Sequence, residues 1–254
     1  MIKQDSKQSP FLITLFISCL LLPLLSSFSI APLVYSFAPK GEEATHNFTL
    51  YNDNNAPAAI QISMWQRECR LNGEDILSEA DDHFIVYPTQ VVLMPFEQQT
   101  VRVSWIHNPN PSQELAYRLI AEELPIALED PTNNTKNKKG GMQMLMRYLT
   151  ALYIVPNNVE PNVKLQSALK ESDEEGNALL AITLNNEGKA RTVLKDFSLN
   201  IKDSAGNEVH FSPEEIPEIN RKVLLAKMQR RYVLPWPKNL NEDITVNFDF
   251  EIAQ

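Results

Sequence analysis

The chain has 254 residues, a net charge of −9 and two cysteines. Because domains run to roughly 100–150 residues, this length favours two domains over one. An acidic chain offers no clustered basic face to displace phosphate counterions, which excludes non-specific binding to nucleic acid. The excess of 17 prolines over 7 glycines favours strands joined by stiff turns over helices.

The first 27 residues have the layout of a secretory signal peptide. Lys3 and Lys7 precede an apolar run at residues 11–25, and two serines follow it. The run is too short to span a bilayer core of about 30 Å comfortably. We therefore expect cleavage near Ser27 and no stable membrane insertion afterwards; a retained N-terminal anchor is the alternative.

Cleavage at this point removes Cys19 and leaves Cys69 as the only thiol of the mature chain. No intramolecular disulfide is then possible. No histidine or basic pattern marks Cys69 as activated, so the sequence predicts a buried, unreactive thiol.

Period-two alternation of apolar and polar residues dominates the rest of the chain and is typical of half-buried antiparallel strands. Clear examples are residues 60–64, 101–105, 197–201 and 244–252. Turn-forming residues recur between the runs at intervals of roughly 10–20 residues, which predicts an all-β sandwich architecture.

Two segments, 48–52 and 182–186, each look like an early strand that runs into a polar loop, and this echo favours a duplicated domain. The Pro- and Asn-rich stretch at 156–161 predicts the boundary. The expected division is a signal peptide at 1–27, an N-terminal domain at 28–157 and a C-terminal domain at 158–254.

From residue 129 to 141 the only apolar side chain is a proline, so we expect a mobile loop there. The next segment, 142–155, is apolar on most of both faces and begins with Met142, Met144 and Met146 at alternate positions. Such a strand either lies inside the first sandwich or is offered to another protein by β-augmentation. The pattern alone supports both readings equally.

Catalytic motifs are mostly absent from the sequence. The sequence has no nucleophile elbow, no glycine-rich phosphate loop and no metalloprotease helix, and its four histidines lack ligand spacing. We therefore expect no enzymatic activity, no metal and no cofactor.

The first half resembles the PapD-like periplasmic chaperones of chaperone–usher pilus assembly. The matching elements, in order and spacing, are residues 84–88, 93–103, 117–126 and 153–156. The polar loop and the Met-rich strand lie between the third and the fourth of these elements. The Val-Arg-Val at 101–103 and the Glu-Leu-Pro at 123–125 are the most specific in combination.

The resemblance implies two immunoglobulin-like β-sandwiches set at an angle. It also implies a periplasmic chaperone that binds pilin subunits by donor-strand complementation and delivers them to an outer-membrane usher. Carried over by position, the donor face of its G1 strand is Met142, Met144, Met146 and Tyr148.

Two features depart from the family pattern. Well-studied members anchor the subunit's terminal carboxylate with two basic residues, at positions held here by Val34 and Ala151, so Arg147 and Lys40 become the candidate anchors. Glu123 is the candidate for an interdomain ion pair. The lone mature thiol excludes the disulfide of the long-loop subclass, which places the chain nearer the archaic branch.

The alternative function is an exported two-domain adhesive or carbohydrate-binding protein built from the same sandwiches. Trp65 or Trp236 would then be exposed contact residues. The role of the Met-rich strand separates the two hypotheses.

Overall fold

The computed structural model describes residues 28–126 and 145–253, and strands dominate both segments. Two short 3₁₀ helices, η2 (Glu42–Ala44) and η3 (Asp81–His83), are the only helices in these segments, and neither is long or apolar enough to cross a membrane. The predicted signal peptide at 1–27 and the predicted loop at 129–141 lie outside the described residues.

The strands alternate between buried and exposed side chains, as the period-two pattern predicted. In the first half they are β1 (Ser29–Ala31), β2 (Val34–Phe37), β3 (Thr45–Tyr51), β4 (Ala58–Cys69), β5 (Asp75–Glu79), β6 (Phe84–Tyr87), β7 (Gln90–Leu93), β8 (Gln98–Trp105), β9 (Leu115–Glu123) and β10 (Arg147–Ile154). In the second half they are β11 (Val163–Ser172), β12 (Ala178–Asn186), β13 (Thr192–Asp203), β14 (Glu208–Phe211), β15 (Val223–Leu224), β16 (Gln229–Pro235) and β17 (Ile244–Ala253). The all-β prediction is confirmed.

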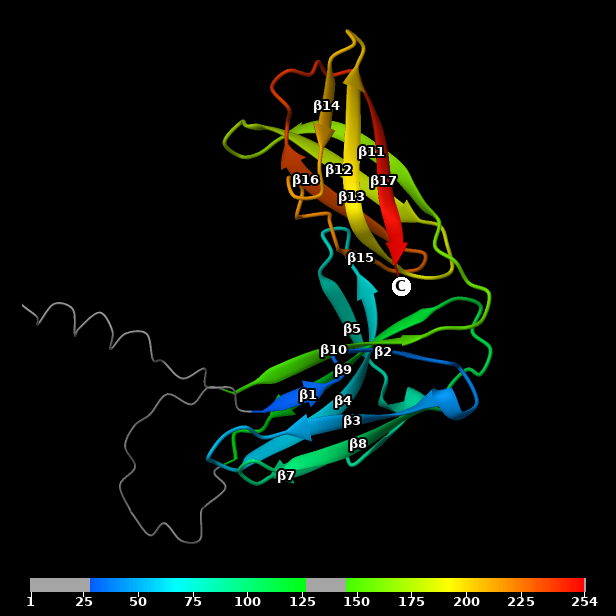
Figure 1. The fold of residues 1–254 in the computed structure, drawn as a ribbon, viewed down its shortest axis with the longest axis vertical. Coiled ribbons are helices and arrows are strands. Elements are labelled where there is room, and N and C mark those ends of the chain that lie inside the picture. Colours follow the sequence, from blue (N-terminus) through cyan, green and yellow to red (C-terminus); the bar gives the residue numbers. More distant parts are fainter. Residues whose placement is uncertain (1–27, 127–144, 254) are drawn as a thin grey trace, which may run out of the picture.

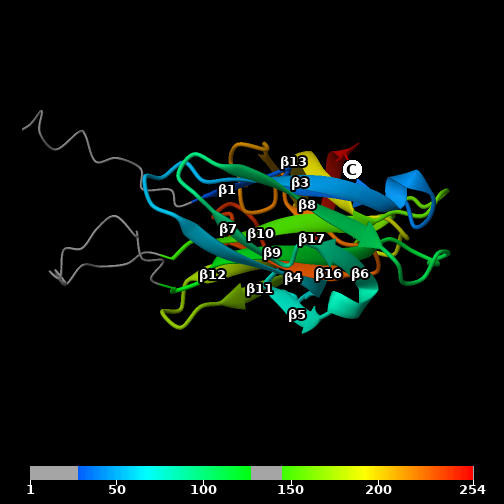
Figure 2. The same ribbon diagram turned by 90° about the horizontal axis from the view of Figure 1, so that it is seen from below.

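The first sandwich packs two sheets face to face. One has the strand order β1–β3–β8–β6, and the other has the order β2–β10–β9–β4–β5, with β7 pairing the start of β4. Figure 2 shows β1, β3 and β8 as one layer over β10, β9 and β4. Large side chains such as Phe48 and Tyr117 fill the space between the sheets. Burying each such side chain contributes about 1.5–3 kcal/mol.

The second sandwich follows the same plan with fewer strands. One sheet has the order β11–β12–β16. In the other sheet, β14 and β15 pair with different parts of one edge of β13, and β17 pairs with the opposite edge. Phe197 and Leu180 lie in a separate core of its own. Figure 1 shows this sandwich rising at an angle from the first, so the two-domain immunoglobulin-like architecture is as expected. The boundary that we propose at 157–158 falls between β10 and β11.

Each sandwich has a corner held by a buried asparagine, Asn52 after β3 and Asn186 at the end of β12. In both, the side-chain amide nitrogen donates to carbonyl oxygens at 2.8–3.3 Å, one of them four residues later and two of them 38 to 42 residues later. These carbonyls belong to Ala56, Leu93 and Met94 in the first sandwich and to Ala190, Leu224 and Leu225 in the second. The echo between 48–52 and 182–186 therefore extends to three-dimensional contacts.

Candidate functional site

The first half of β10 has an open backbone edge. Along its whole length β10 pairs with β9, but β2 pairs only with residues 151–154 of β10. The preceding strand, β1, belongs to the opposite sheet and pairs with β3. Among the described residues, 147–150 therefore have a strand neighbour on one side only. An unpaired row of backbone donors and acceptors is a template for another strand.

The two faces of this segment differ. Met146 and Tyr148 point inward, half-buried against the core of the first sandwich, and the Tyr148 ring packs edge-on against Phe28 at 5.0 Å. Leu145 and Leu149 lie on the opposite face and are 42% and 43% exposed. The structure thus places two of the four predicted donor residues on one face. The other two, Met142 and Met144, lie outside the described residues.

The two positions at which well-studied members of the resembling family carry their basic anchors lie side by side. Val34 and Ala151 are direct partners in the parallel pairing of β2 with β10. Neither basic candidate is in this row. Arg147 pairs with Glu122, with its Nε 3.5 Å from the Glu122 carboxylate, and Lys40 donates from Nζ to Asn110 Oδ1 at 3.1 Å.

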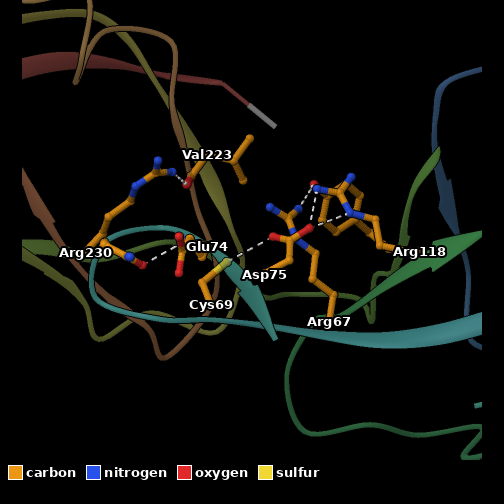
Figure 3. Close-up of polar contacts among 9 residues, drawn as sticks. Arg67, Cys69, Glu74, Asp75, Arg118, Val223 and Arg230 are labelled. Atoms are coloured by element: carbon orange, nitrogen blue, oxygen red, sulfur yellow. Dashed lines mark hydrogen bonds and ion pairs between the residues drawn. The ribbon is translucent and has the colours of Figure 1, made fainter. Parts of the chain in front are cut away.

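A basic residue that sequence reasoning missed stands next to Ala151. Arg118 on β9 is the partner of Ala151 in the β9–β10 register, so the two side chains share one face. Asp75 holds Arg118 through Oδ2, which accepts from Arg118 Nε at 2.9 Å, and holds Arg67 through Oδ1, which accepts from Arg67 Nε at 2.7 Å. Arg67 Nη1 also donates to the Tyr153 hydroxyl at 3.4 Å. Figure 3 shows both guanidinium groups converging on the one carboxylate.

This cluster carries two positive charges and one negative charge in a chain of net charge −9. Burial alone would raise the pKa of Asp75, but the hydrogen bonds and charges of Arg67 and Arg118 outweigh it and hold that pKa below its ordinary value of 3.8. The carboxylate is therefore ionised at neutral pH. One positive charge remains unbalanced within the cluster, beside the row of Val34 and Ala151.

The ion pair between the two sandwiches involves a carboxylate other than the predicted one. Arg191 donates from Nη1 to Glu114 Oε2 at 2.9 Å, and both side chains are buried. Burial raises the pKa of Glu114, although the charge and hydrogen bond of Arg191 act in the opposite direction. The predicted candidate, Glu123, lies at the end of β9 and accepts from the Met146 amide at 3.4 Å.

Arg191 also touches both strands that flank the site. Its guanidinium lies 3.6 Å from the ring centre of Tyr153 on β10, and its Nη2 donates to Ser36 Oγ on β2 at 3.2 Å. Beside this contact, Tyr153 and Ala151 pack against Leu225 of the second sandwich. The interdomain contact on β10 therefore begins at Ala151, directly after the open edge at residues 147–150.

The tryptophans give little support to the adhesive hypothesis. Trp236 is buried and donates from Nε1 to the Leu240 carbonyl at 3.2 Å, so the expectation that it is exposed is wrong for this residue. Trp65 is half-buried and donates to Ser63 Oγ. Cys69 is a free thiol, half-buried against the interdomain contact, and burial raises its pKa. Within residues 28–126 and 145–253, no group of three or more acidic, histidine or cysteine side chains could hold a metal ion.

Comparison with known proteins agrees with this architecture. Residues 36–160 match the family described as pili and flagellar-assembly chaperone, PapD N-terminal domain. No curated protein matches the chain.

Solved structures with a similar fold include chaperones of fimbrial systems. A chain of the CsuC–CsuE chaperone–tip adhesion subunit pre-assembly complex from archaic chaperone–usher Csu pili of Acinetobacter baumannii is 16% identical, with a TM-score of 0.56, and the match covers 87% of this chain and 98% of that one. The class 5 fimbriae chaperone CfaA is 13% identical, with a TM-score of 0.51 and coverage of 88% and 99%. At such identities the likeness concerns the fold.

Proposed function

From the premise that the chain belongs to the PapD-like chaperones of pilus assembly, we propose that it binds incomplete fimbrial subunits and passes them to an outer-membrane usher. The proposal places this work in the periplasm, after removal of residues 1–27, and involves no catalysis. The observation that carries it is the open backbone edge at residues 147–150.

An open edge beside apolar side chains suits donor-strand complementation. A subunit that lacks its last strand can pair its backbone with β10, and the ladder of hydrogen bonds provides affinity whatever the subunit's sequence. Side chains at alternate positions then fill the gap in the subunit's core. Met146 and Tyr148 lie on the core side of β10, and Met142 and Met144 continue that alternation toward the N-terminus. Methionine is unbranched and adapts to pockets of different shape, which suits several subunits.

We propose that Arg118, supported by Arg67, takes the terminal carboxylate of the subunit. A strand that extends past residue 150 of β10 reaches the row of Val34 and Ala151, and Arg118 is the next residue across that row. Asp75 holds Arg118 through Nε and Nη2, and because a guanidinium has five N–H donors, Arg118 keeps further N–H groups that can donate to a second carboxylate. Arg147 and Lys40 stay alternative anchors. Membership of the archaic branch stays a prediction and fits an anchor outside the usual positions.

The first test is capture of a subunit. The chain is co-produced in the periplasm with a pilin-type subunit, and Met144→Asp is compared with Gln143→Asp. We expect Met144→Asp to lower co-purification by at least about tenfold, because a charge at an alternate donor position cannot enter an apolar core. Gln143 has the opposite parity and serves as the matched control. Equal co-purification of both variants, or a wild-type monomer that binds glycans and no subunit, contradicts the proposal.

The second test isolates the carboxylate. A synthetic peptide of the C-terminal strand that the subunit does have is made as the free acid and as the amide, and binding of each to the chain is measured by fluorescence anisotropy. Wild type should prefer the acid, and Arg118→Ala should remove most of that preference while still binding the amide form. A preference that survives in Arg118→Ala assigns the anchor to another residue and leaves the strand-binding proposal intact.

A further inference from the structure

The β4–β5 hairpin reaches from the first sandwich to the second. Its turn runs from Arg70 to Glu74, closed by the Arg70 amide donating to the Glu74 carbonyl at 2.9 Å. At the tip, the Leu71 carbonyl accepts from the backbone amide of Arg231 on β16 at 2.6 Å. Figure 1 shows β4 and β5 projecting toward the second sandwich. A backbone hydrogen bond between domains fixes position independently of side-chain identity.

The hairpin tip covers an edge that is otherwise open. Among the described strands, β16 pairs only with β12, so its other edge has no strand neighbour. Amides along a strand point alternately to its two sides. Since the Arg231 amide donates to Leu71, it points away from β12, and without the hairpin it would face solvent.

Gly73 fits the hairpin tip against Arg230. Its φ is +87°, a conformation that favours glycine, and a Cβ at this position would lie 2.4 Å from Arg230 Cζ. Arg230 in turn donates from Nη1 to the Val223 carbonyl at 3.3 Å, so its guanidinium is held between the hairpin and β15. A side chain at residue 73 therefore has to displace the guanidinium.

The sandwiches meet in an apolar cluster that includes Ala151, Tyr153 and Leu225, and polar contacts add to it at two places. One is the hairpin tip on β16, and the other is the buried pair of Glu114 and Arg191. Rotation of one sandwich against the other has to break at least one of these polar contacts, because they lie at different points of the interface.

We infer that the β4–β5 hairpin is a latch that fixes the orientation of the two sandwiches by docking on the open edge of β16. This latch does not depend on any bound subunit. It also carries Arg67 and Asp75 on its two strands, so the docked tip and the arginine cluster belong to one rigid element.

Amide hydrogen exchange of the full chain, followed by NMR, tests the latch directly. The Arg231 amide should be protected in the wild type, and Gly73→Ala should speed its exchange by about tenfold or more. The amides of Arg230 and Tyr232 point toward β12 and should stay protected. Gly176→Ala is the matched control, since Gly176 has a φ of +84° with no atom near its Cβ position. It carries the same backbone cost without touching Arg230.

Residual dipolar couplings on the same samples report orientation. One alignment tensor should fit both sandwiches in the wild type and in Gly176→Ala, and two different tensors should be needed for Gly73→Ala. Arg230→Ala, which leaves Gly73 unchanged, is the second variant and should free the Arg231 amide in the same way. An unprotected Arg231 amide in the wild type, or a single tensor in both latch variants, overturns the inference.

Discussion

The two sandwiches share a corner but differ at their edges. Asn52 and Asn186 bind carbonyls at equivalent places, so the chain uses one solution twice to join a strand to a later loop. At the edges, the start of β10 in the first sandwich has no strand neighbour among the described residues on the side away from β9, whereas the outer edge of β16 in the second is contacted by the tip of the β4–β5 hairpin. The repeated corner maintains the fold, and the unrepeated edge is available for binding.

The corners bear on the stability of each sandwich, and the open edge of β10 bears on the proposed binding of a subunit. An edge strand with unpaired backbone groups risks uncontrolled pairing with other chains, and proteins usually limit that risk by shortening, charging or covering such an edge. The second sandwich instead orients the first through Arg191 and β16. Substitutions at the two corners should therefore have similar effects, and substitutions at the edges should have different ones.

The largest effect should come from the corner asparagines. Asn52→Ala and Asn186→Ala each leave three carbonyl oxygens without this donor, and we expect a loss of about 3–5 kcal/mol in the free energy of unfolding of the sandwich concerned. Urea titration followed by hydrogen-exchange mass spectrometry reports the two sandwiches separately. Equivalent corners predict similar losses.

Asn185→Ala is the control for the second corner. Asn185 is the half-buried neighbour of Asn186 and should cost less than about 1 kcal/mol. Losses of very different size in Asn52→Ala and Asn186→Ala would show that the corners are alike in geometry but not in energy.

Asp75 should make the first sandwich sensitive to acid. Because its pKa is lower in the folded state than its ordinary 3.8, the carboxylate stabilises the fold above that pH, and the contribution is lost as the pH falls. Asp75→Asn should cost about 2 kcal/mol at pH 7, since it leaves Arg67 and Arg118 without their carboxylate. Urea unfolding between pH 2 and 7 should show the two curves converging in acid. A constant gap across this range would contradict the assigned ion pairs.

Each sandwich also buries one hydroxyl that has no partner in the described residues, Thr150 in the first and Tyr232 in the second. Burial raises the pKa of Tyr232 to about 12. Thr150→Val and Tyr232→Phe remove these groups at little change in shape and should each stabilise the protein by about 1 kcal/mol. Thermal unfolding measures both, and a loss of stability in either variant would reveal a partner for that hydroxyl.

Much of this architecture could be predicted from the sequence. Alternation identified strands such as 101–105 and 244–252 and showed which side chains face a core, because a strand's faces follow from its own residues. The echo at 48–52 and 182–186 also identified the corner strands. Alternation does not tell which strands become neighbours, since pairing depends on packing of the whole sheet.

The contacts that the sequence did not reveal all depend on which strands become neighbours. Arg67 and Arg118 are 51 residues apart in sequence and meet only because β4 and β9 are adjacent. Glu114 and Arg191 are separated by 77 positions and belong to different sandwiches. The Glu-Leu-Pro motif indicated Glu123 for that pair through family likeness, and likeness carries a role over only where the surrounding contacts are also kept. The one available signal for the cluster was Arg118, the only arginine in the β9 sequence.

The smallest effect on stability should come from Arg147, at the open edge itself. Its pair with Glu122 joins side chains that are 52% and 42% exposed, so Arg147→Ala should change the free energy of unfolding by less than about 0.5 kcal/mol. Four residues of strand, about 13 Å, separate it from Ala151, which places it far from the Arg118 row. We therefore expect Arg147→Ala to keep the preference for a free-acid peptide over its amide, in contrast to Arg118→Ala. If Arg147→Ala loses that preference at unchanged melting temperature, the carboxylate binds at the N-terminal end of β10, and the bound strand runs in the opposite direction along the open edge.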